Sequence, residues 1–260
     1  MTKKLKLHWA SSKPNFGDWL SPIIAKHLSG RAIEHSSIDK CDLLAIGSLL
    51  QRAKEGFLKR QINVWGSGFI EDQKLKKSKH LYHAVRGKKS SSLLKNKTID
   101  CFGDPGLLID QVYKKSSTTK TLGIVPHYKD QNNPVIQQLS QTVTNSVIVD
   151  VFEPPEEVIR QISQCEYIVS SSLHGLIMAD TYQIPNQWIE VSNHVRGNGW
   201  KFYDYYSVFD IITPNAMQLS EANLSLESII THIGDYQRTG LDSVKEALTN
   251  SFPFPKTLEI

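Results

Sequence analysis

Short apolar runs alternate along the chain with segments in which apolar residues recur every three or four positions. The runs have strand length and several end in Gly or Ser, whereas the segments between them have the period of an amphipathic helix. This alternation is typical of α/β proteins built on parallel sheets. The predicted strands are 4–10, 41–48, 63–68, 80–86, 121–128, 146–151, 167–170 and 184–191. The predicted helices are 20–28, 134–143, 156–164, 173–179, 200–206, 220–233 and 240–250.

A polar stretch divides this alternation near the middle of the chain. Residues 113–120, Y-K-K-S-S-T-T-K, are polar or flexible and indicate a linker. We therefore predict an N-terminal α/β domain over 1–115 and a C-terminal α/β domain over 120–260, which ends in helices. A chain of 260 residues has room for two small domains of this kind.

Polar side chains follow the predicted strands. Ser67 lies in a Gly-Ser-Gly turn after one strand, Arg86 directly follows the apolar end of another, and His127 ends a third. Because the carboxyl ends of parallel strands line the crevice where ligands bind, we place Arg86 there rather than among solvated surface charges. His127 is either a ligand of the same crevice or a packed histidine. The chain contains neither a complete G-x-G-x-x-G motif nor a P-loop, so a dinucleotide or ATP site is not indicated.

The stretch 167–186, Y-I-V-S-S-S-L-H-G-L-I-M-A-D-T-Y-Q-I-P-N, has the pattern of a strand, a tight turn and a helix. Ser172 stands at the N-cap position, with Ser171 before it, and His174 then lies in the first helical turn. Helix N-termini present unpaired N–H groups and partial positive charge to anions. His174 can therefore meet a bound phosphate; the alternative is that it caps or packs locally.

A similar turn follows the first predicted strand. Asn15, Gly17 and Asp18 precede a helix whose apolar face ends at Gly30. Gly17 allows the backbone to come close to a ligand. Asp18 either caps the helix, which is the favoured interpretation, or holds a sugar hydroxyl.

The aromatic-rich helix near residue 200 carries further candidates. Lys201 and Asp204 are three residues apart and therefore lie on one helical face. Trp200 follows a glycine and is either a sugar-stacking residue or part of the core.

Composition and charge narrow the function. The net charge is +4, and the lysines are scattered without the interleaved aromatics that stack on bases, which argues against nucleic acid. An anionic small molecule or an anionic membrane face remains as a partner. The three cysteines are far apart, no H-E-x-x-H spacing occurs, and no metal site is predicted. Because no apolar segment has the length of a signal peptide core or a membrane span, we expect a cytoplasmic protein, with the inner face of the plasma membrane as an alternative place of work.

Seven motifs between Trp9 and Tyr206 resemble, in order, those of the polysaccharide pyruvyltransferase family. They are N-F-G-D, G-S-G-F, V-R-G-K-K-S, G-D-P-G-L-L, G-I-V-P-H-Y, S-S-S-L-H-G-L-I-M-A-D-T-Y-Q-I-P and K-F-Y-D-Y-Y. The resemblance implies two Rossmann-like α/β domains facing across a cleft, as in GT-B glycosyltransferases. It also implies transfer of the enolpyruvyl carbons of phosphoenolpyruvate to two hydroxyls of one sugar. The products would be a cyclic pyruvate ketal and phosphate, and no cofactor is implied besides this donor substrate.

The resemblance assigns donor binding and catalysis to Arg86 and His174. Many members carry an arginine where this chain has Ser172, and Lys201 is our candidate for the missing cation. We expect His174 to protonate the methylene carbon and to be charged mainly when phosphate is bound. Asp18 or Asp204 would accept the proton of the attacking hydroxyl.

The other expected contacts of the substrates lie at the turns and helix starts. The N-terminal half is expected to bind the acceptor, an oligosaccharide or lipid-linked saccharide, and the C-terminal half to bind the donor. Two other functions remain open, a nucleotide-sugar glycosyltransferase of the same fold and a non-catalytic glycan-binding domain. The remaining predicted substrate ligands are Asn15, Gly17, Ser67, His127, Ser171, Ser172 and Trp200.

Overall fold

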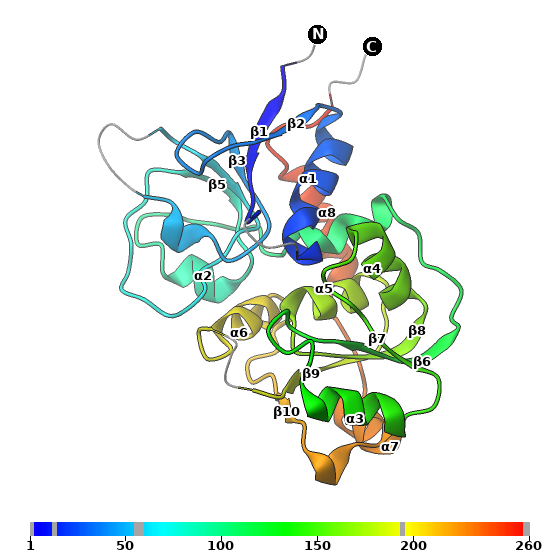
Figure 1. The fold of residues 1–260 in the computed structure, drawn as a ribbon. Helices are drawn as coiled ribbons and strands as arrows, with labels where there is room; N and C mark the ends of the chain where they lie inside the picture. The colour runs from blue at the N-terminus through cyan, green and yellow to red at the C-terminus, as the bar shows by residue number, and fades with distance from the viewer. Residues whose placement is uncertain (1–2, 12–14, 55–59, 193–195, 257–260) are drawn as a thin grey trace.

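Two parallel sheets of five strands, each flanked by helices, make up the computed structural model (Figure 1). It describes residues 3–11, 15–54, 60–192 and 196–256. The predicted α/β class with parallel sheets is therefore confirmed.

The first half of the chain forms the N-terminal sheet, in the strand order β2-β1-β3-β4-β5. The central strands are apolar because both faces are covered, as is usual in parallel sheets. Its strands are β1 (Leu5–His8), β2 (Ile33–His35), β3 (Leu43–Leu44), β4 (Asn63–Trp65) and β5 (Leu81–Ala84). The helices of this half are α1 (Phe16–Ser29) and α2 (Lys88–Ser92), with 3-10 helices η1 (Leu50–Arg52) and η2 (Pro105–Gln111).

Helix α1 ends before Gly30, as predicted, but begins at Phe16 rather than at residue 20. The Asn15 side chain accepts a hydrogen bond from the Gly17 N–H at 3.4 Å, and Gly30 ends the helix in the left-handed conformation. Leu20 and Ile24 on its apolar face are fully buried, which is worth ~1.5–3 kcal/mol for each side chain. Asn15 rather than Asp18 is therefore the cap, so the favoured interpretation of Asp18 as a capping residue is wrong.

The second half forms the C-terminal sheet, in the order β10-β9-β8-β6-β7. Its strands are β6 (Lys120–Val125), β7 (Ser146–Ile148), β8 (Cys165–Ser170), β9 (Asn186–Glu190) and β10 (Met217–Gln218). Its helices are α3 (Pro134–Thr142), α4 (Pro155–Ser163), α5 (Leu173–Thr181), α6 (Trp200–Tyr206), α7 (Leu226–Ile233) and α8 (Leu241–Asn250). Two short 3-10 helices, η3 (Ser207–Phe209) and η4 (Glu221–Asn223), complete it.

Alternate residues of this sheet face different helices. Leu122 and Ile124 belong to a buried cluster with residues of α3 and α7, whereas Val125 and Ile168 belong to a cluster with residues of α4 and α5. Helices α4 and α5 thus lie between the C-terminal sheet and the N-terminal half (Figure 1). The start of α5 is thereby directed towards the other sheet.

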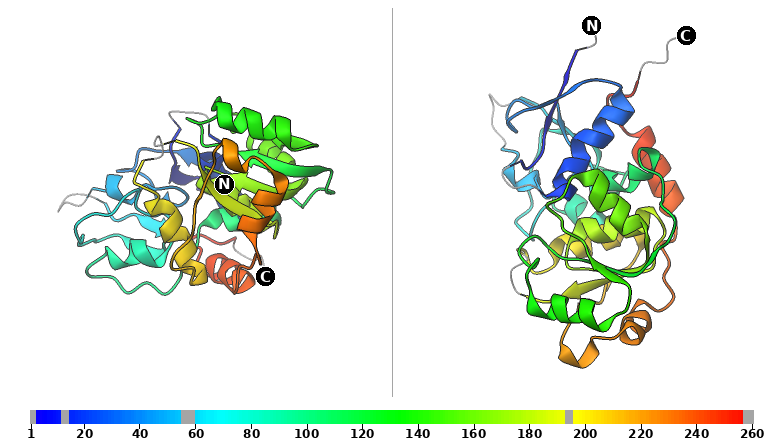
Figure 2. Two further views of the ribbon diagram at one scale, coloured as in Figure 1. Left: turned by 90° about the horizontal axis from the view of Figure 1, so that it is seen from below. Right: turned by 45° about the vertical axis from the view of Figure 1, so that its right-hand side comes forward.

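The end of the chain returns to the N-terminal sheet. Helix α8 contacts η2, and the Trp65 Nε1–H of β4 donates to the Leu248 carbonyl at 2.9 Å. The Lys256 N–H also donates to the Leu28 carbonyl of α1 at 3.0 Å. In the right-hand view of Figure 2, α8 (red) lies nearer to α1 (blue) than to α3 (green) and α7 (orange). The C-terminal segment therefore ties the two sheets together.

Some elements were not predicted from the sequence. The G-D-P-G segment, expected to be a simple turn, opens the 3-10 helix η2, and the polar segment after β5 forms α2. The edge strands β2 and β10 are three and two residues long, which is too short for a periodic signal. These four elements complete the surroundings of the central strands.

Candidate active site

A cavity of about 360 Å³ lies where the carboxyl ends of strands from both sheets meet. We call it the central cavity. This arrangement confirms the prediction that the turns after the strands line a crevice. From the N-terminal half it is lined by Ala10, Asn15, Asp18, Ser48, Arg86 and Asp104, and from the C-terminal half by His127, Ser172, His174 and Lys201.

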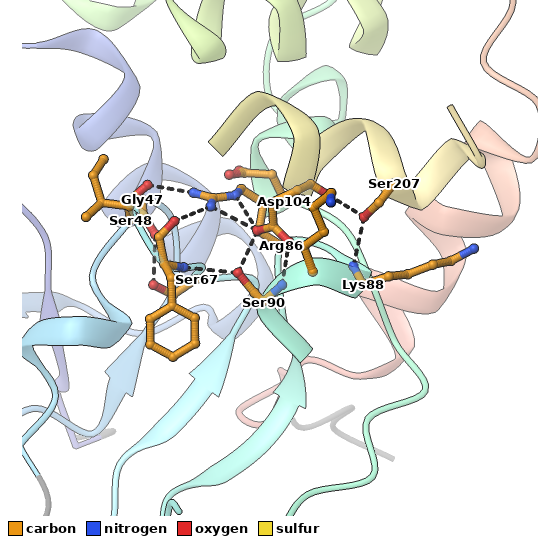
Figure 3. Close-up of polar contacts among 12 residues, drawn as sticks. Gly47, Ser48, Ser67, Arg86, Lys88, Ser90, Asp104 and Ser207 are labelled. Atoms are coloured by element: carbon orange, nitrogen blue, oxygen red, sulfur yellow. Dashed lines mark hydrogen bonds and ion pairs between the residues drawn. The ribbon is translucent and has the colours of Figure 1, made fainter. Parts of the chain in front are cut away.

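Arg86 follows β5 and is 1% exposed. Its Nη1 donates to Ser48 Oγ at 2.6 Å, and its Nη2 donates to the Phe69 carbonyl at 2.5 Å (Figure 3). A Cβ on Gly68 would lie 2.5 Å from Cζ of Arg86, so only glycine lets the guanidinium take this place. Arg86 is thus held rigidly while it still lines the central cavity.

Asp204 of α6 forms a buried ion pair with Arg86. Its Oδ2 accepts from Arg86 Nε at 2.9 Å and from Ser90 Oγ at 2.6 Å, and it lies 2.9 Å from Arg86 Nη2. Its Oδ1 accepts from the Ser90 N–H at 2.7 Å. Asp204 is fully buried and is not among the residues that line the cavity. The structure therefore gives Asp204 a different role from the predicted base, because it positions and neutralises Arg86.

His174 lies in the first turn of α5, as predicted, and its side chain is 12% exposed. The start of α1 packs against it, since a Cβ on Gly17 would lie 2.1 Å from His174 Nδ1, and the Phe16 ring meets it edge-on with centroids 6.4 Å apart. Gly17 therefore accommodates the imidazole. Burial, with the positive charges of Lys201 and Arg86, lowers the pKa of His174 to about 3. In the free protein the ring is neutral at physiological pH.

Asp104, which the sequence did not single out, lies directly opposite His174. Its Oδ1 caps η2 by accepting from the Gly106 N–H at 2.9 Å, and its Oδ2 is 4.0 Å from His174 Nε2. Burial raises the pKa of Asp104 to about 6, with smaller contributions from other groups of the site. An Asp before Pro is a strong signal for a turn and a helix cap. Because capping explains only one carboxylate oxygen, the role of the other oxygen could not be predicted from the sequence.

Asp18 projects from the first turn of α1 into the central cavity. Its Oδ2 accepts from Asn15 Nδ2 at 3.3 Å. Burial raises the pKa of Asp18 to about 6, although Lys201 and Asn15 oppose this change. Of the two carboxylates predicted as bases, Asp18 is the one that lines the cavity.

Lys201 reaches the cavity from α6, and its ammonium lies 5.2 Å from the centroid of the Phe202 ring. Burial and the charge of Arg86 lower the pKa of Lys201 to about 8, so the ammonium form predominates at neutral pH. Arg86, His174 and Lys201, which come from three separate elements, are thus brought together.

Four predicted substrate ligands, Gly17, Ser67, Ser171 and Trp200, do not line this cavity; Gly17 packs against the His174 ring instead. Ser67 is fully buried and donates to the Gly47 carbonyl at 2.8 Å, while Ser171 donates to Asp130 at 3.2 Å and lines a neighbouring cavity. Trp200 packs against the buried apolar cluster of the N-terminal sheet. These side chains support the turns around the site rather than face it.

His127 and Ser172 do line the cavity. The His127 N–H donates to Ser171 Oγ at 2.8 Å, which joins the end of β6 to the end of β8. Ser172 occupies the N-cap position of α5, but its side chain makes no capping hydrogen bond. The start of α5 therefore faces the cavity, as predicted.

Positive charge at the mouth of the cavity was not predicted. Arg52, Lys129 and Arg196 are exposed and line it together with the buried Arg86 and Lys201. Arg52 ends η1 and the other two lie in separate loops, so no sequence pattern connects them. Arg86 is paired with Asp204 and Arg196 with Glu71. Arg52, Lys129 and Lys201 add three further positive charges to the lining, against the carboxyl groups of Asp18 and Asp104, so the cavity is suited to an anion.

The fold and this cavity define an α/β protein with a cavity of cationic and titratable side chains at the ends of strands from two parallel sheets. The chain belongs to the polysaccharide pyruvyl transferase family, which it matches over residues 2–193. The resemblance drawn from the seven motifs is thereby confirmed. Across the described ranges, no helix has the length and apolar character that a membrane crossing requires.

Two relatives can be compared over most of the chain. An uncharacterized protein of Acanthamoeba polyphaga mimivirus is 25% identical over 222 residues, which cover 80% of this chain and 76% of that protein. The succinoglycan biosynthesis protein ExoV of Rhizobium meliloti is 26% identical over 218 residues, which cover 76% of this chain and 62% of ExoV. The chain therefore matches less than two thirds of the length of ExoV.

Proposed function

We propose that this protein transfers pyruvate from phosphoenolpyruvate to two hydroxyls of one sugar in a polysaccharide or oligosaccharide. The product is a cyclic pyruvate ketal, and inorganic phosphate is released. The observation that carries the proposal is the convergence of Arg86, His174 and Lys201 on one cavity, with the start of α5 facing it.

The charge of the cavity fits this donor. Phosphoenolpyruvate carries about three negative charges at neutral pH, and its phosphate and carboxylate both accept charge-assisted hydrogen bonds. Arg86 and Lys201 lie deep in the cavity, and the N–H groups at the start of a helix add partial positive charge. The exposed arginines and lysine at the mouth would attract the anion from solution.

The reaction requires one proton to reach carbon and two hydroxyls to lose theirs. The methylene carbon gains a proton through its π electrons, two C–O bonds form at the neighbouring carbon, and its bond to the phosphate oxygen breaks. One hydroxyl proton replaces the proton given to carbon, and the other leaves with the phosphate. In this scheme His174 is the acid and Asp18, which lines the cavity, accepts the proton of the attacking hydroxyl.

The acceptor is proposed to lie on the N-terminal side and the donor on the C-terminal side, in a GT-B-like arrangement of the two halves. Asn15 and Asp18 of α1 line the acceptor side of the cavity. The acceptor is an oligosaccharide or a lipid-linked saccharide. We place the reaction in the cytoplasm, where contact with a membrane-bound acceptor would be peripheral.

Incubation with phosphoenolpyruvate and an array of galactosides, glucosides and mannosides tests the proposal. We expect release of phosphate and a gain in acceptor mass equal to pyruvic acid less water. His174→Ala should lower the rate under saturating donor by ~10²–10⁴-fold, the usual contribution of a positioned proton donor. His232→Ala, at an exposed histidine of α7 outside the cavity, is the matched control.

Other outcomes would replace the proposal. Release of nucleotide from a sugar nucleotide, without reaction of phosphoenolpyruvate, would identify a glycosyltransferase. Binding of a glycan with no turnover of any donor would identify a glycan-binding protein.

A further inference from the structure

Two buried polar atoms that belong to opposite halves of the chain face each other in the central cavity. They are Asp104 Oδ2, on a residue that is fully buried, and His174 Nε2. Neither atom has a hydrogen-bond partner among the described residues. Such atoms are rare in native proteins, and each lowers the stability of the fold. A pair that persists at this cost in a ligand cavity indicates a functional requirement.

Neighbouring residues fix the orientation of both the Asp104 carboxyl and the His174 ring. Asp104 Oδ1 is bound to the Gly106 N–H at 2.9 Å, which leaves Oδ2 as the oxygen directed at His174. The imidazole is confined by the backbone of Gly17 on its Nδ1 side and by the edge of the Phe16 ring. Helix η2, which Asp104 caps, packs directly on α5, which carries His174. The packing of these elements therefore keeps the Asp104 carboxyl and the His174 ring facing each other.

Two negative groups can favour a proton on His174. Burial and the charges of Lys201 and Arg86 lower the pKa of the ring to about 3 in the free protein. A bound phosphate acts against this change because a negative charge favours the imidazolium. A carboxylate near Nε2 acts in the same direction, and Asp104 is the carboxyl in that position.

The groups around the pair determine where its proton lies. Burial raises the pKa of Asp104, so the free protein keeps a proton on the carboxyl more readily than on the ring. A phosphate bound nearer to the ring than to the carboxyl favours transfer of that proton to the ring, which leaves an imidazolium beside a carboxylate. The charged groups that act on the pair are Arg86 after β5, Asp18 on α1, and Lys201 and Asp204 on α6.

We propose that Asp104 is the positioning residue of His174: it orients the imidazole through Nε2 and shares with it the one proton that His174 gives to the donor. This inference rests on the proposed function. The proton passes from the pair to the methylene carbon, and the attacking sugar hydroxyl restores it by way of Asp18. Atoms and charge balance without a further reactant.

Asp104→Asn is the decisive variant, because an asparagine Oδ1 can still accept from Gly106 and only the second oxygen is replaced. We expect kcat to fall ~10²–10⁴-fold. The Kd of inorganic phosphate, the probe for the anion site, should stay equal or become smaller, because a negative charge has been removed. The alkaline fall of kcat/KM should move to lower pH. Asp104→Glu should regain part of the activity, and Asp110→Asn, at a carboxylate of η2 paired with Lys245, is the control expected to behave as the wild type.

An NMR titration of the His174 imidazole separates this inference from the proposed function, because it needs no turnover. In the wild type, inorganic phosphate should raise the pKa of the ring, and in Asp104→Asn this rise should be smaller. An equal rise in both proteins, or an unchanged pH profile in an active Asp104→Asn enzyme, would overturn the role of Asp104. Coupling in the titration without any reaction of phosphoenolpyruvate would instead overturn the proposed function alone.

Discussion

Gly17→Ala sets two physical effects against each other. Gly17 is the second residue of α1 and has no positive φ, so alanine fits the backbone and should favour the helix by up to ~1 kcal/mol. The added Cβ, however, would lie 2.1 Å from His174 Nδ1 and 2.4 Å from its Cγ. Ordinary contacts between such atoms are ~3.5–4 Å, so the ring or the helix must move by more than ~1 Å.

The displacement should appear in activity more than in stability. Overpacking costs ~1–3 kcal/mol, which the gain in helix propensity partly offsets, so we expect a loss of unfolding free energy of ~0–2 kcal/mol. A displacement of ~1 Å of a catalytic group costs ~10²-fold in rate. Urea denaturation and kcat with saturating donor measure the two effects.

The same substitution in a His174→Ala background provides the control. His174→Ala removes the ring atoms at 2.1 and 2.4 Å but keeps the Cβ, which would lie 2.8 Å from the added methyl group, so Gly17→Ala should cost less stability in this background than in the wild type. A double-mutant cycle then isolates the contact. Equal stability effects in both backgrounds, or a Gly17→Ala enzyme with the kcat of the wild type, would refute the reasoning.

Two further predictions concern buried charge. Asp204→Asn leaves Arg86 buried without its counter-ion and should lower the unfolding free energy by ~3–5 kcal/mol in urea denaturation. Asp210→Asn breaks the exposed pair with Lys88 and should lower it by at most ~1 kcal/mol. Similar losses in the two variants would contradict this prediction. Because burial raises the pKa of Asp18 from 3.8 to about 6, the folded protein binds a proton that the unfolded chain does not, and stability should fall as pH rises through that window. Asp18→Asn should flatten this fall when unfolding is measured at each pH, and an unchanged slope would count against it.

The sequence predicted the site well where local pattern controls position. The strand, turn and helix from β8 to α5 are predicted from neighbouring residues, and they place His174 correctly in the first helical turn. The edge of a parallel sheet then brings Arg86 to the same cavity as His174. These predictions need only the period of the elements and the direction of the strands.

The sequence could not supply the partners that packing brings from the other half. Spacing placed Asp204 beside Lys201 on α6. Only the fold shows that the Asp204 carboxylate is paired with Arg86, 118 residues earlier in the chain. Asp104 has a complete local explanation as a cap, so nothing in its neighbourhood points to His174. Trp200 has both exposed and core interpretations until the N-terminal apolar cluster is seen to cover it.

The hydrogen bonds and the ion pair that hold Arg86 also affect how substrates reach the cavity. The guanidinium that meets the cavity joins the end of β5 to α6, and the Lys88 N–H donates to Ser207 Oγ at 3.0 Å beside it. Parting the two sheets here would separate Arg86 from Asp204 and break the hydrogen bonds around them, so we expect the closed form to predominate. We therefore expect substrates and products to pass through the mouth of a preformed cavity without a hinge motion. Crystal structures determined with and without phosphate should then superpose at β5 and α6.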